Sequence, residues 1–304
     1  MFGNWISCFP GLGSARDFLL PLFYLAASHS MSSLPARSLD RLRHHYEVER
    51  ELARRLRQST AAERTTLFAT LYNELFERVQ DHPRLTRRVT PEDSRRKVAG
   101  QMRLLEPLLT PETVLLEFAP GDGRLAAAAA AKAKKVIGVD ISDQREASDV
   151  SPANFELVIY DGYKLSVPSK SVDVCFSYQF LEHLHPDDID PHFQTAHRVL
   201  RSGGVYAFDT PHRYSGPHDI SRYFTDELHC FHFQEWTHRE MRRVLKRNGF
   251  STAWIFRFGK PQRSAWMNLL VDAVELVLSP LPHKLRRRLC ARLFPSVGMV
   301  AVAD

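Results

Sequence analysis

The chain has 304 residues, of which 44% are hydrophobic and 25% are charged, as in an ordinary globular protein large enough to bury a full core. Its formal charge is +6, and the basic excess lies in residues 37–103 and 260–292, without the interleaved aromatics or motifs of a nucleic-acid-binding module. The four cysteines form no C-x-x-C pair, which excludes an obvious disulfide framework or zinc site. The cysteines thus lead us to expect a cytoplasmic protein, and the charge pattern leads us to expect no nucleic-acid partner.

Residues 1–36 differ from the rest of the chain. They contain an apolar run from Phe18 to Ala27 that is too short to cross a bilayer. Arg16 and Asp17 cancel each other just before this run, so it lacks the positive flank of a secretory signal. We expect a disordered or spurious leader, with translation starting at Met31, and keep a secretory signal as the alternative.

Residues 37–103 are predicted to form a helical cap. Apolar residues recur at helical spacing in two segments, and Thr60 with Glu63 forms a capping box before the second. One hypothesis is that these helices cover the cofactor site and shape the acceptor pocket. The other is an appended bundle that only buries apolar surface, including at a homodimer contact.

A strand, a glycine turn and a helix follow between Thr113 and Ala133. The apolar run at 114–118 contains Glu117, and Gly121 and Gly123 then precede an alanine-rich helix. This order is typical of the first unit of a nucleotide-binding α/β domain. The glycines with Ala126 satisfy G-x-G-x-x-A, which also suits NAD or FAD. Glu117 would repel a pyrophosphate, however, and suits a cationic ligand.

A second strand, within Lys134–Ser142, ends in Asp140. This acid lies about 20 residues beyond the glycine turn, where an acceptor for ribose hydroxyls is expected. A ribose together with a positively charged amino-acid tail describes S-adenosylmethionine.

Three further motifs follow in order: Tyr160-Asp161-Gly162, the segment Ser171–Pro186, and the segment Ala196–Arg213 with its Gly-Gly turn. With the first two motifs, this series resembles the class I S-adenosylmethionine-dependent methyltransferases. The resemblance implies a Rossmann-like, doubly wound α/β fold with a mostly parallel seven-stranded sheet and an antiparallel last strand. The catalytic domain would span residues 104–304, with a helical insertion at 261–295.

The resemblance also implies roles for the cofactor residues. Glu117 would lie near the methionine amino group, Asp140 and Ile141 at the ribose, and Asp161 at the adenine amino group. The turn and pocket would be completed by Ala119, Gly121, Gly123, Gly162 and Ser177. Ala119 departs from the family, which usually has glycine there. Alternatively, Glu117 pairs with an arginine, Asp140 only ends its strand, and Asp161 is a turn residue.

Candidate acceptor-side residues cluster after the fourth and fifth strands. Glu182 and His183 follow the fourth strand, and His183 or His218 is the preferred base, because an unshifted histidine accepts protons near neutral pH. A structural hydrogen bond is the alternative for each histidine. The expected acceptor-binding residues are Tyr178, His212, Arg213, Asp219 and Arg222.

We predict no bound metal. Ubiquinone-pathway O-methyltransferases, which the fourth motif resembles, carry a second acid where this chain has Gln179. His229 and His232 are interpreted as packing or loop residues rather than ligands.

The insertion contains an apolar segment, Trp266–Leu278, whose polar residues form one narrow stripe, so we expect it to be covered on most sides. A basic amphipathic segment follows at 283–294. The two could make peripheral membrane contact through residues 265–294, or roof the active site.

The sequence thus predicts a methyltransferase that uses S-adenosylmethionine and a small-molecule acceptor (sugar, lipid-linked or quinone-like), methylated on oxygen or nitrogen. A dinucleotide-dependent oxidoreductase and a non-catalytic scaffold are the alternatives.

Overall fold

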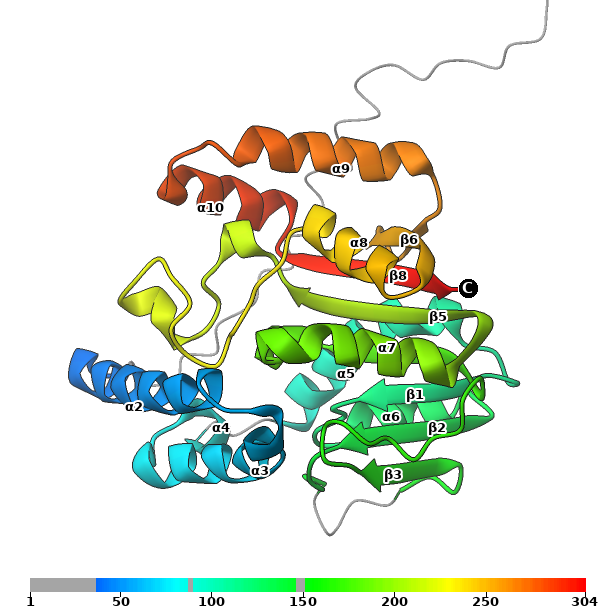
Figure 1. Cartoon of the computed structure of the whole chain (residues 1–304), viewed down its shortest axis with the longest axis horizontal. Coiled ribbons are helices and arrows are strands. Elements are labelled where there is room, and N and C mark those ends of the chain that lie inside the picture. The colour runs from blue at the N-terminus through cyan, green and yellow to red at the C-terminus, as the bar shows by residue number, and fades with distance from the viewer. Residues whose placement is uncertain (1–36, 87–89, 146–150) are drawn as a thin grey trace, which may run out of the picture. The chain divides into compact units, whose positions relative to one another are not determined.

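The computed structural model describes residues 37–86, 90–145 and 151–304, so the predicted leader lies outside the described residues. Eight strands form one sheet in the order β3-β2-β1-β4-β5-β8-β6-β7 (Figure 1). The strands are β1 Val114–Phe118, β2 Lys135–Asp140, β3 Phe155–Ile159, β4 Val172–Tyr178, β5 Leu200–Pro211, β6 Phe250–Arg257, β7 Lys260–Gln262 and β8 Ser296–Ala303.

The sheet confirms the predicted doubly wound fold. Strands β3, β2, β1, β4 and β5 are parallel, and β8 runs antiparallel between β5 and β6. The structure has one strand more than expected, because β6 turns back through Phe258 and Gly259 into the short strand β7. The predicted Gly-Gly turn lies within β5, where the pairing with β4 shifts register. The strand order reverses between β1 and β4, and ligands of such sheets bind beyond the strand ends at that point.

Helices cover both faces of the sheet. They are α5 Pro91–Leu105, α6 Arg124–Ala130, α7 Ile189–Val199 and α8 His238–Arg247. Neighbouring residues of β1 point to opposite faces: Leu115 packs with α5 and α6, whereas Leu116 packs with α7 and α8. The alanines of α6 let this helix approach the sheet closely, next to the glycine turn. Short 3-10 helices complete the connections: η2 Glu106–Leu108, η3 Leu181–His183, η4 Pro186–Asp188, η5 Arg213–Ser215 and η6 Ile220–Tyr223.

The predicted cap helices are α2 Leu39–Arg57, α3 Ala61–Arg78 and the short α4 Pro83–Thr86. The capping box is confirmed, with the Thr60 amide donating to Glu63 Oε2 over 2.7 Å. Apolar residues of α2 and α3 pack against Phe231 and Phe233 from the loop after β5. Arg64 of α3 is buried and forms two 2.8 Å hydrogen bonds with Asp188 of η4. The cap is therefore bound both to this loop and to the segment after β4.

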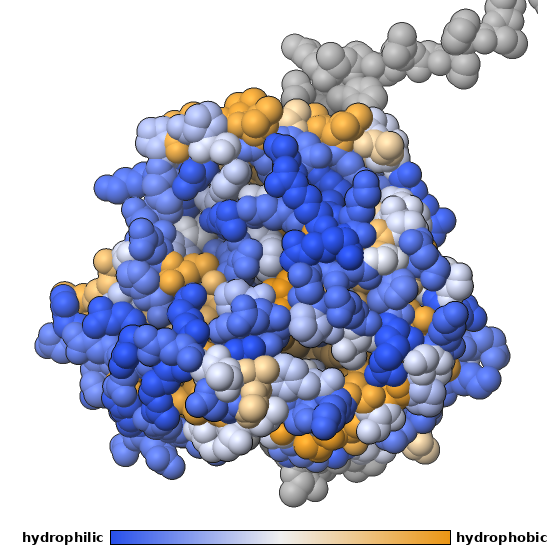
Figure 2. Space-filling view, in the orientation of Figure 1, coloured by the Kyte–Doolittle hydropathy of each residue, from blue (hydrophilic) through white to orange (hydrophobic). Residues whose placement is uncertain are grey.

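The insertion forms two helices, α9 Ala265–Leu278 and α10 His283–Leu293. The expectation that α9 is covered on most sides is wrong: Leu269 and Val277 are 68% and 69% exposed. Its polar residues instead face the protein. Figure 2 shows hydrophobic surface at the end of the molecule where α9 lies in Figure 1. Within the described ranges, no helix is both long and apolar enough to cross a membrane.

Candidate functional site

The turn after β1 keeps a backbone conformation that favours glycine. Gly121 and Gly123 have φ values of 56° and 70°, and Ala119 also has a positive φ of 52°. A Cβ added to Gly121 would contact nothing within 4 Å, so it would project into the open space beside the turn. The turn therefore presents bare backbone toward that space, where a ligand could approach closely.

Glu117 lies at the end of β1, just before this turn. Its side chain is 3% exposed, and its Oε2 atom has no hydrogen-bond partner among the described residues. Burial, with the nearby Asp122 and Asp140, raises the pKa of Glu117 to about 8. An unpaired buried carboxylate is costly, and a cationic ligand would remove this cost. In the alternative interpretation Glu117 pairs with an arginine, but no such pair occurs among the described residues.

Asp140 ends β2 beside the same turn. Its Oδ1 accepts from the Ile141 amide over 2.7 Å, and its Oδ2 accepts from the Gly121 amide over 3.3 Å. Burial raises the pKa of Asp140, and these backbone hydrogen bonds oppose the shift. The carboxylate thus fixes the turn that links β1 to α6, and Glu117, Gly121 and Asp140 lie close together.

The other predicted cofactor residues are engaged differently. Asp161 is exposed, and its Oδ1 accepts from the Tyr163 and Lys164 amides, which lowers its pKa. Gly162 follows with a φ of 87°. Ser177 is fully buried, and its hydroxyl lies 2.9 Å from the Tyr206 hydroxyl, so it is bonded within the core of the sheet.

Glu182 and His183 lie in η3, just past the end of β4. Glu182 is buried and accepts from the Thr210 hydroxyl over 3.0 Å. Burial raises the pKa of Glu182 to about 7. His183 Nδ1 lies 3.0 Å from the Phe231 carbonyl oxygen and therefore donates to it, which leaves Nε2 as an acceptor. Nε2 is 4.0 Å from Glu182 Oε1.

His232 joins this pair from the loop after β5. Its ring makes an edge contact with His183 at 4.9 Å, and its Nδ1 lies 2.9 Å from Glu235 Oε1. Burial and His232 together lower the pKa of His183 to about 3. For His232, burial opposes the charged form, but Glu235 and Glu182 raise its pKa overall.

His218 belongs to a second histidine–glutamate pair. Its Nδ1 lies 3.1 Å from Glu235 Oε2, without hydrogen-bond geometry, and its amide donates to Glu235 Oε1 over 2.8 Å. Burial opposes ionisation of Glu235, but His218 and His232 lower its pKa to about 2. Asp219 lies nearby, and its Oδ2 accepts a hydrogen bond from the His232 amide over 3.3 Å.

Four predicted acceptor residues have other environments. His212 is fully buried and bonds Glu275 of α9, so its side chain is not open to an acceptor. Arg213 is paired with Glu240 of α8. Arg222 stacks on the Tyr223 ring. Tyr178 is partly exposed at the end of β4, and burial, with Asp209 and Glu182, raises its pKa to about 12.

Several groups of side chains could hold a metal ion. Glu182, His183 and His232 place ligand atoms within 4.8 Å of one another. His229, in contrast, bonds the Tyr46 hydroxyl over 2.8 Å and does not join His232. The prediction that no metal is bound stays a prediction. The other groups are His45 with Glu49 and His82, His212 with His238 and Glu275, and Glu49 with Asp219 and Cys230.

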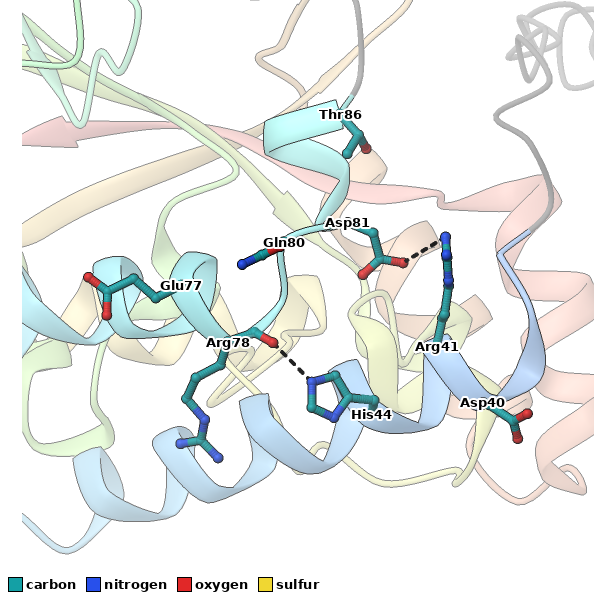
Figure 3. Close-up of a pocket in the computed structure, with 8 residues that line it drawn as sticks. All are labelled: Asp40, Arg41, His44, Glu77, Arg78, Gln80, Asp81 and Thr86. Atoms are coloured by element: carbon teal, nitrogen blue, oxygen red, sulfur yellow. Dashed lines mark hydrogen bonds and ion pairs between the residues drawn. The ribbon is translucent and has the colours of Figure 1, made fainter.

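A surface hollow of about 600 Å³ lies elsewhere, on the cap (Figure 3). Its walls are mostly charged, and the figure shows His44 directed at the Arg78 carbonyl and Arg41 at Asp81. None of its residues is a predicted site residue. We therefore place the candidate site at the strand ends, where Glu117 lies in β1 and Glu182 follows the neighbouring strand β4.

Sequence reasoning missed Glu235 and underrated His232. Glu235 is a single acid in a loop, and no spacing rule connects it to His218. The pair His229-x-x-His232 did carry a signal, but its two rings point to different partners. Only the path of the loop brings His232 and Glu235 to the end of β4.

The strand order and the glycine turn together are typical of Rossmann-like nucleotide-binding domains. Residues 116–208 match the family described as "Methyltransferase domain". A probable S-adenosylmethionine-dependent methyltransferase of Mycolicibacterium smegmatis is 33% identical over 138 residues, which are 45% of this chain and 51% of that protein. Residues 116–208 therefore resemble a methyltransferase domain, and the match spans about half the length of this relative.

Solved structures resemble the chain more distantly. A putative methyltransferase structure in complex with the Haloferax volcanii Trm112 activator has a TM-score of 0.48 and 15% identity, over 70% of this chain and 95% of that one. A methyltransferase from Archaeoglobus fulgidus has a TM-score of 0.47 and 18% identity, and the match covers 70% of this chain and 95% of that one. The fold assignment rests on the strand order described above.

Proposed function

We propose that the protein is an S-adenosylmethionine-dependent methyltransferase that methylates oxygen or nitrogen of a small-molecule acceptor. The observation that carries this proposal is the buried Glu117 carboxylate, whose Oε2 has no partner among the described residues, beside a bare glycine turn. An ammonium group placed there would supply the missing partner. A pyrophosphate would add two negative charges next to it, which disfavours NAD or FAD.

The residues around the turn fit this cofactor. Glu117 would receive the amino group, and the backbone at Gly121 would allow close approach. Asp140 would accept the ribose hydroxyls while its hydrogen bond from the Gly121 amide keeps the turn in place. When bound, S-adenosylmethionine supplies a methyl group activated by its sulfonium. The protein then has to align the acceptor, exclude water and remove a proton.

Glu182 and His183 are the proposed proton-accepting pair. The pKa of Glu182, about 7, leaves this acid partly ionised at neutral pH, which suits a general base. His183 is the more exposed of the two and offers Nε2 to the acceptor. The pair of His218 and Glu235 is the second candidate, because its histidine is also partly exposed.

The acceptor side supports a ring-bearing or amphiphilic molecule. Tyr178 at the end of β4 is 37% exposed, and the side chains of His183 and His218 are 27% and 30% exposed. Sugar, lipid-linked and quinone-like acceptors fit such surroundings of aromatic and polar groups.

Two measurements test the proposal. Calorimetric titration with S-adenosylmethionine and, separately, with NADH distinguishes a methyltransferase from an oxidoreductase. Transfer of a labelled methyl group to small molecules of a cell extract distinguishes an enzyme from a binding scaffold. Failure to bind S-adenosylmethionine at millimolar concentration would refute the proposal.

A further inference from the structure

Helix α9 exposes a continuous apolar face. Its exposed large residues are spaced three, four and seven apart, which places them on one side of a helix. They are Trp266, Leu269, Leu270, Leu276 and Val277, all between 47% and 69% exposed. Ala273, between them, is exposed as well. This face is covered by no described residue.

The polar side of α9 is held against the protein, which fixes the orientation of the helix. Asn268 donates to the Ala253 carbonyl over 3.0 Å, and Asp272 pairs with Arg242 of α8. Glu275 is buried and lies 3.0 Å from His212 and 2.8 Å from His238. The helix cannot turn its apolar side inward without breaking these contacts, so the exposure is built into the fold.

The segment of the chain that carries this face is strongly basic. Residues 241–303 contain twelve Lys and Arg but only two acids, Asp272 and Glu275, and both acids are already engaged. Lys284, Arg288 and Arg292 of α10 are exposed, and none of them forms an ion pair with a described residue. In Figure 1, α10 lies next to α9 at the same end of the molecule. An apolar stripe beside unpaired cations matches the chemistry of an anionic lipid surface.

We propose that the α9–α10 hairpin docks on the surface of a membrane that contains anionic lipids. The apolar face of α9 would enter the boundary between headgroups and acyl chains, and the cations of α10 would contact the headgroups. A second copy of the chain fits less well, because a symmetric contact would bring the same cations of both copies together.

The hairpin also connects to the candidate acceptor side. Glu275 of α9 bonds His212 at the end of β5, and Arg286 of α10 stacks on Tyr214 at 5.0 Å. The loop that carries His218 and His232 begins at this point. Docking would therefore bring the membrane next to the acceptor loop, which favours a lipid-linked or otherwise amphiphilic acceptor. Only this last step rests on the proposed function.

Sedimentation with lipid vesicles tests the docking. The full chain is mixed with vesicles of phosphatidylcholine alone and with vesicles containing about one quarter phosphatidylglycerol, at low and high salt. We expect binding to the anionic vesicles, weakened by salt. Replacing Leu269 and Leu276 by Gln should lower the partition coefficient at least tenfold for each leucine. Replacing Arg288 and Arg292 by Gln should lower it about fivefold for each arginine.

Matched controls change exposed residues of the same kinds elsewhere. Leu39→Gln with Leu85→Gln, on the cap, and Arg95→Gln with Arg103→Gln, on α5, should bind vesicles like the wild-type protein. All substituted positions are exposed, so the thermal unfolding midpoint should stay unchanged in every variant. Binding of S-adenosylmethionine, measured in parallel without lipid, reports on the proposed function separately.

Three results would overturn the docking proposal. The wild-type chain could fail to bind anionic vesicles. The α9 and α10 variants could bind as well as wild type, which would locate the contact elsewhere in the chain. Finally, sedimentation without lipid could show a dimer that Leu269→Gln dissociates, which would make the apolar face an interface between two copies.

Discussion

Glu117 carries most of the functional argument at the scale of single residues. A carboxylate with 3% exposure and an unpartnered Oε2 is unfavourable in isolation, because burial removes its hydration without replacing it. Proteins tolerate such groups mainly where a ligand or a proton completes them. The glycine turn beside Glu117 leaves room for the ligand.

Cofactor binding should release a proton from Glu117. Because burial raises the pKa of this acid to about 8, it is largely protonated at neutral pH in the free protein, and an ammonium ligand would favour its ionised form. The affinity for S-adenosylmethionine should therefore rise up to about tenfold per pH unit as the pH approaches about 8. Calorimetry at pH 7 in buffers of different ionisation enthalpy should detect the released proton. Equal heats in all buffers would contradict this assignment.

The pH dependence of turnover should distinguish Glu182 from His183 as the base. With a pKa of about 7, Glu182 predicts that kcat/KM rises through neutral pH and then becomes constant. His183, whose pKa is lowered to about 3, would give no such rise. We expect Glu182→Gln to lower kcat by 10²–10⁴-fold, roughly the usual contribution of a general base, and to abolish the rise. A rise retained in this variant would exclude Glu182.

Ala119 should be a strained position. Its φ of 52° is unfavourable for a residue with a Cβ, at roughly 1–2 kcal/mol, whereas glycine costs about 0.5–1 kcal/mol in unfolded-state entropy. Ala119→Gly should therefore stabilise the protein by about 0.5–1 kcal/mol. Urea unfolding measures this difference. A destabilised variant would show that the alanine methyl group makes contacts that outweigh the strain.

At the scale of elements, a single buried acid joins α9 to two other parts of the fold. Glu275 accepts from the ring of His212 and from the ring and amide of His238, so it joins α9 to the end of β5 and the start of α8. Burial disfavours the ionised form of Glu275, but these hydrogen bonds and the electrostatic attraction of the two histidines outweigh it and lower the pKa of Glu275. Its contribution to stability is therefore present above the unfolded-state pKa of about 4.3 and is lost as the pH falls toward the lowered folded-state value.

Glu275→Gln should destabilise the protein by about 3 kcal/mol at pH 7, because an amide puts N–H groups against existing donors. Asp272→Asn is the control on the same helix. This acid is partly exposed and pairs with Arg242, so its loss should cost less than about 1 kcal/mol. Equal losses in the two variants, measured by urea unfolding, would show that the buried contacts do not anchor α9.

The elements that the sequence predicted are those with local signals. The apolar run at 114–118 predicts a strand, the glycines after it predict a turn, and the alanines of α6 predict a helix. The short β7 has no such signal, since only its pairing with β6 makes it a strand. The sequence showed the polar stripe of α9, but it did not show which side of the helix faces the protein. That side is decided by the contacts of α9 with His212 and His238. For the same reason, Glu235 could not be predicted.

At the scale of the whole described structure, the cap and the sheet domain are joined through buried charges. Arg64 of α3 forms paired hydrogen bonds with Asp188, and the Tyr163 hydroxyl donates to the same carboxylate over 3.0 Å. Tyr163 follows the Asp161-Gly162 motif, so this network connects the cap to a predicted cofactor segment. The cap, the glycine turn and the loop after β5 therefore surround one end of the sheet, where the proposed reaction would take place.

The most direct test of the central claim is a calorimetric titration of the full chain with S-adenosylmethionine, repeated for Glu117→Gln. Glu156→Gln is the control, because Glu156 is an exposed strand residue paired with Lys135 on the surface. We predict that the wild-type and control proteins bind alike and that Glu117→Gln binds at least tenfold more weakly, through loss of a buried charge-assisted contact. Equal affinity in all three proteins would contradict the account.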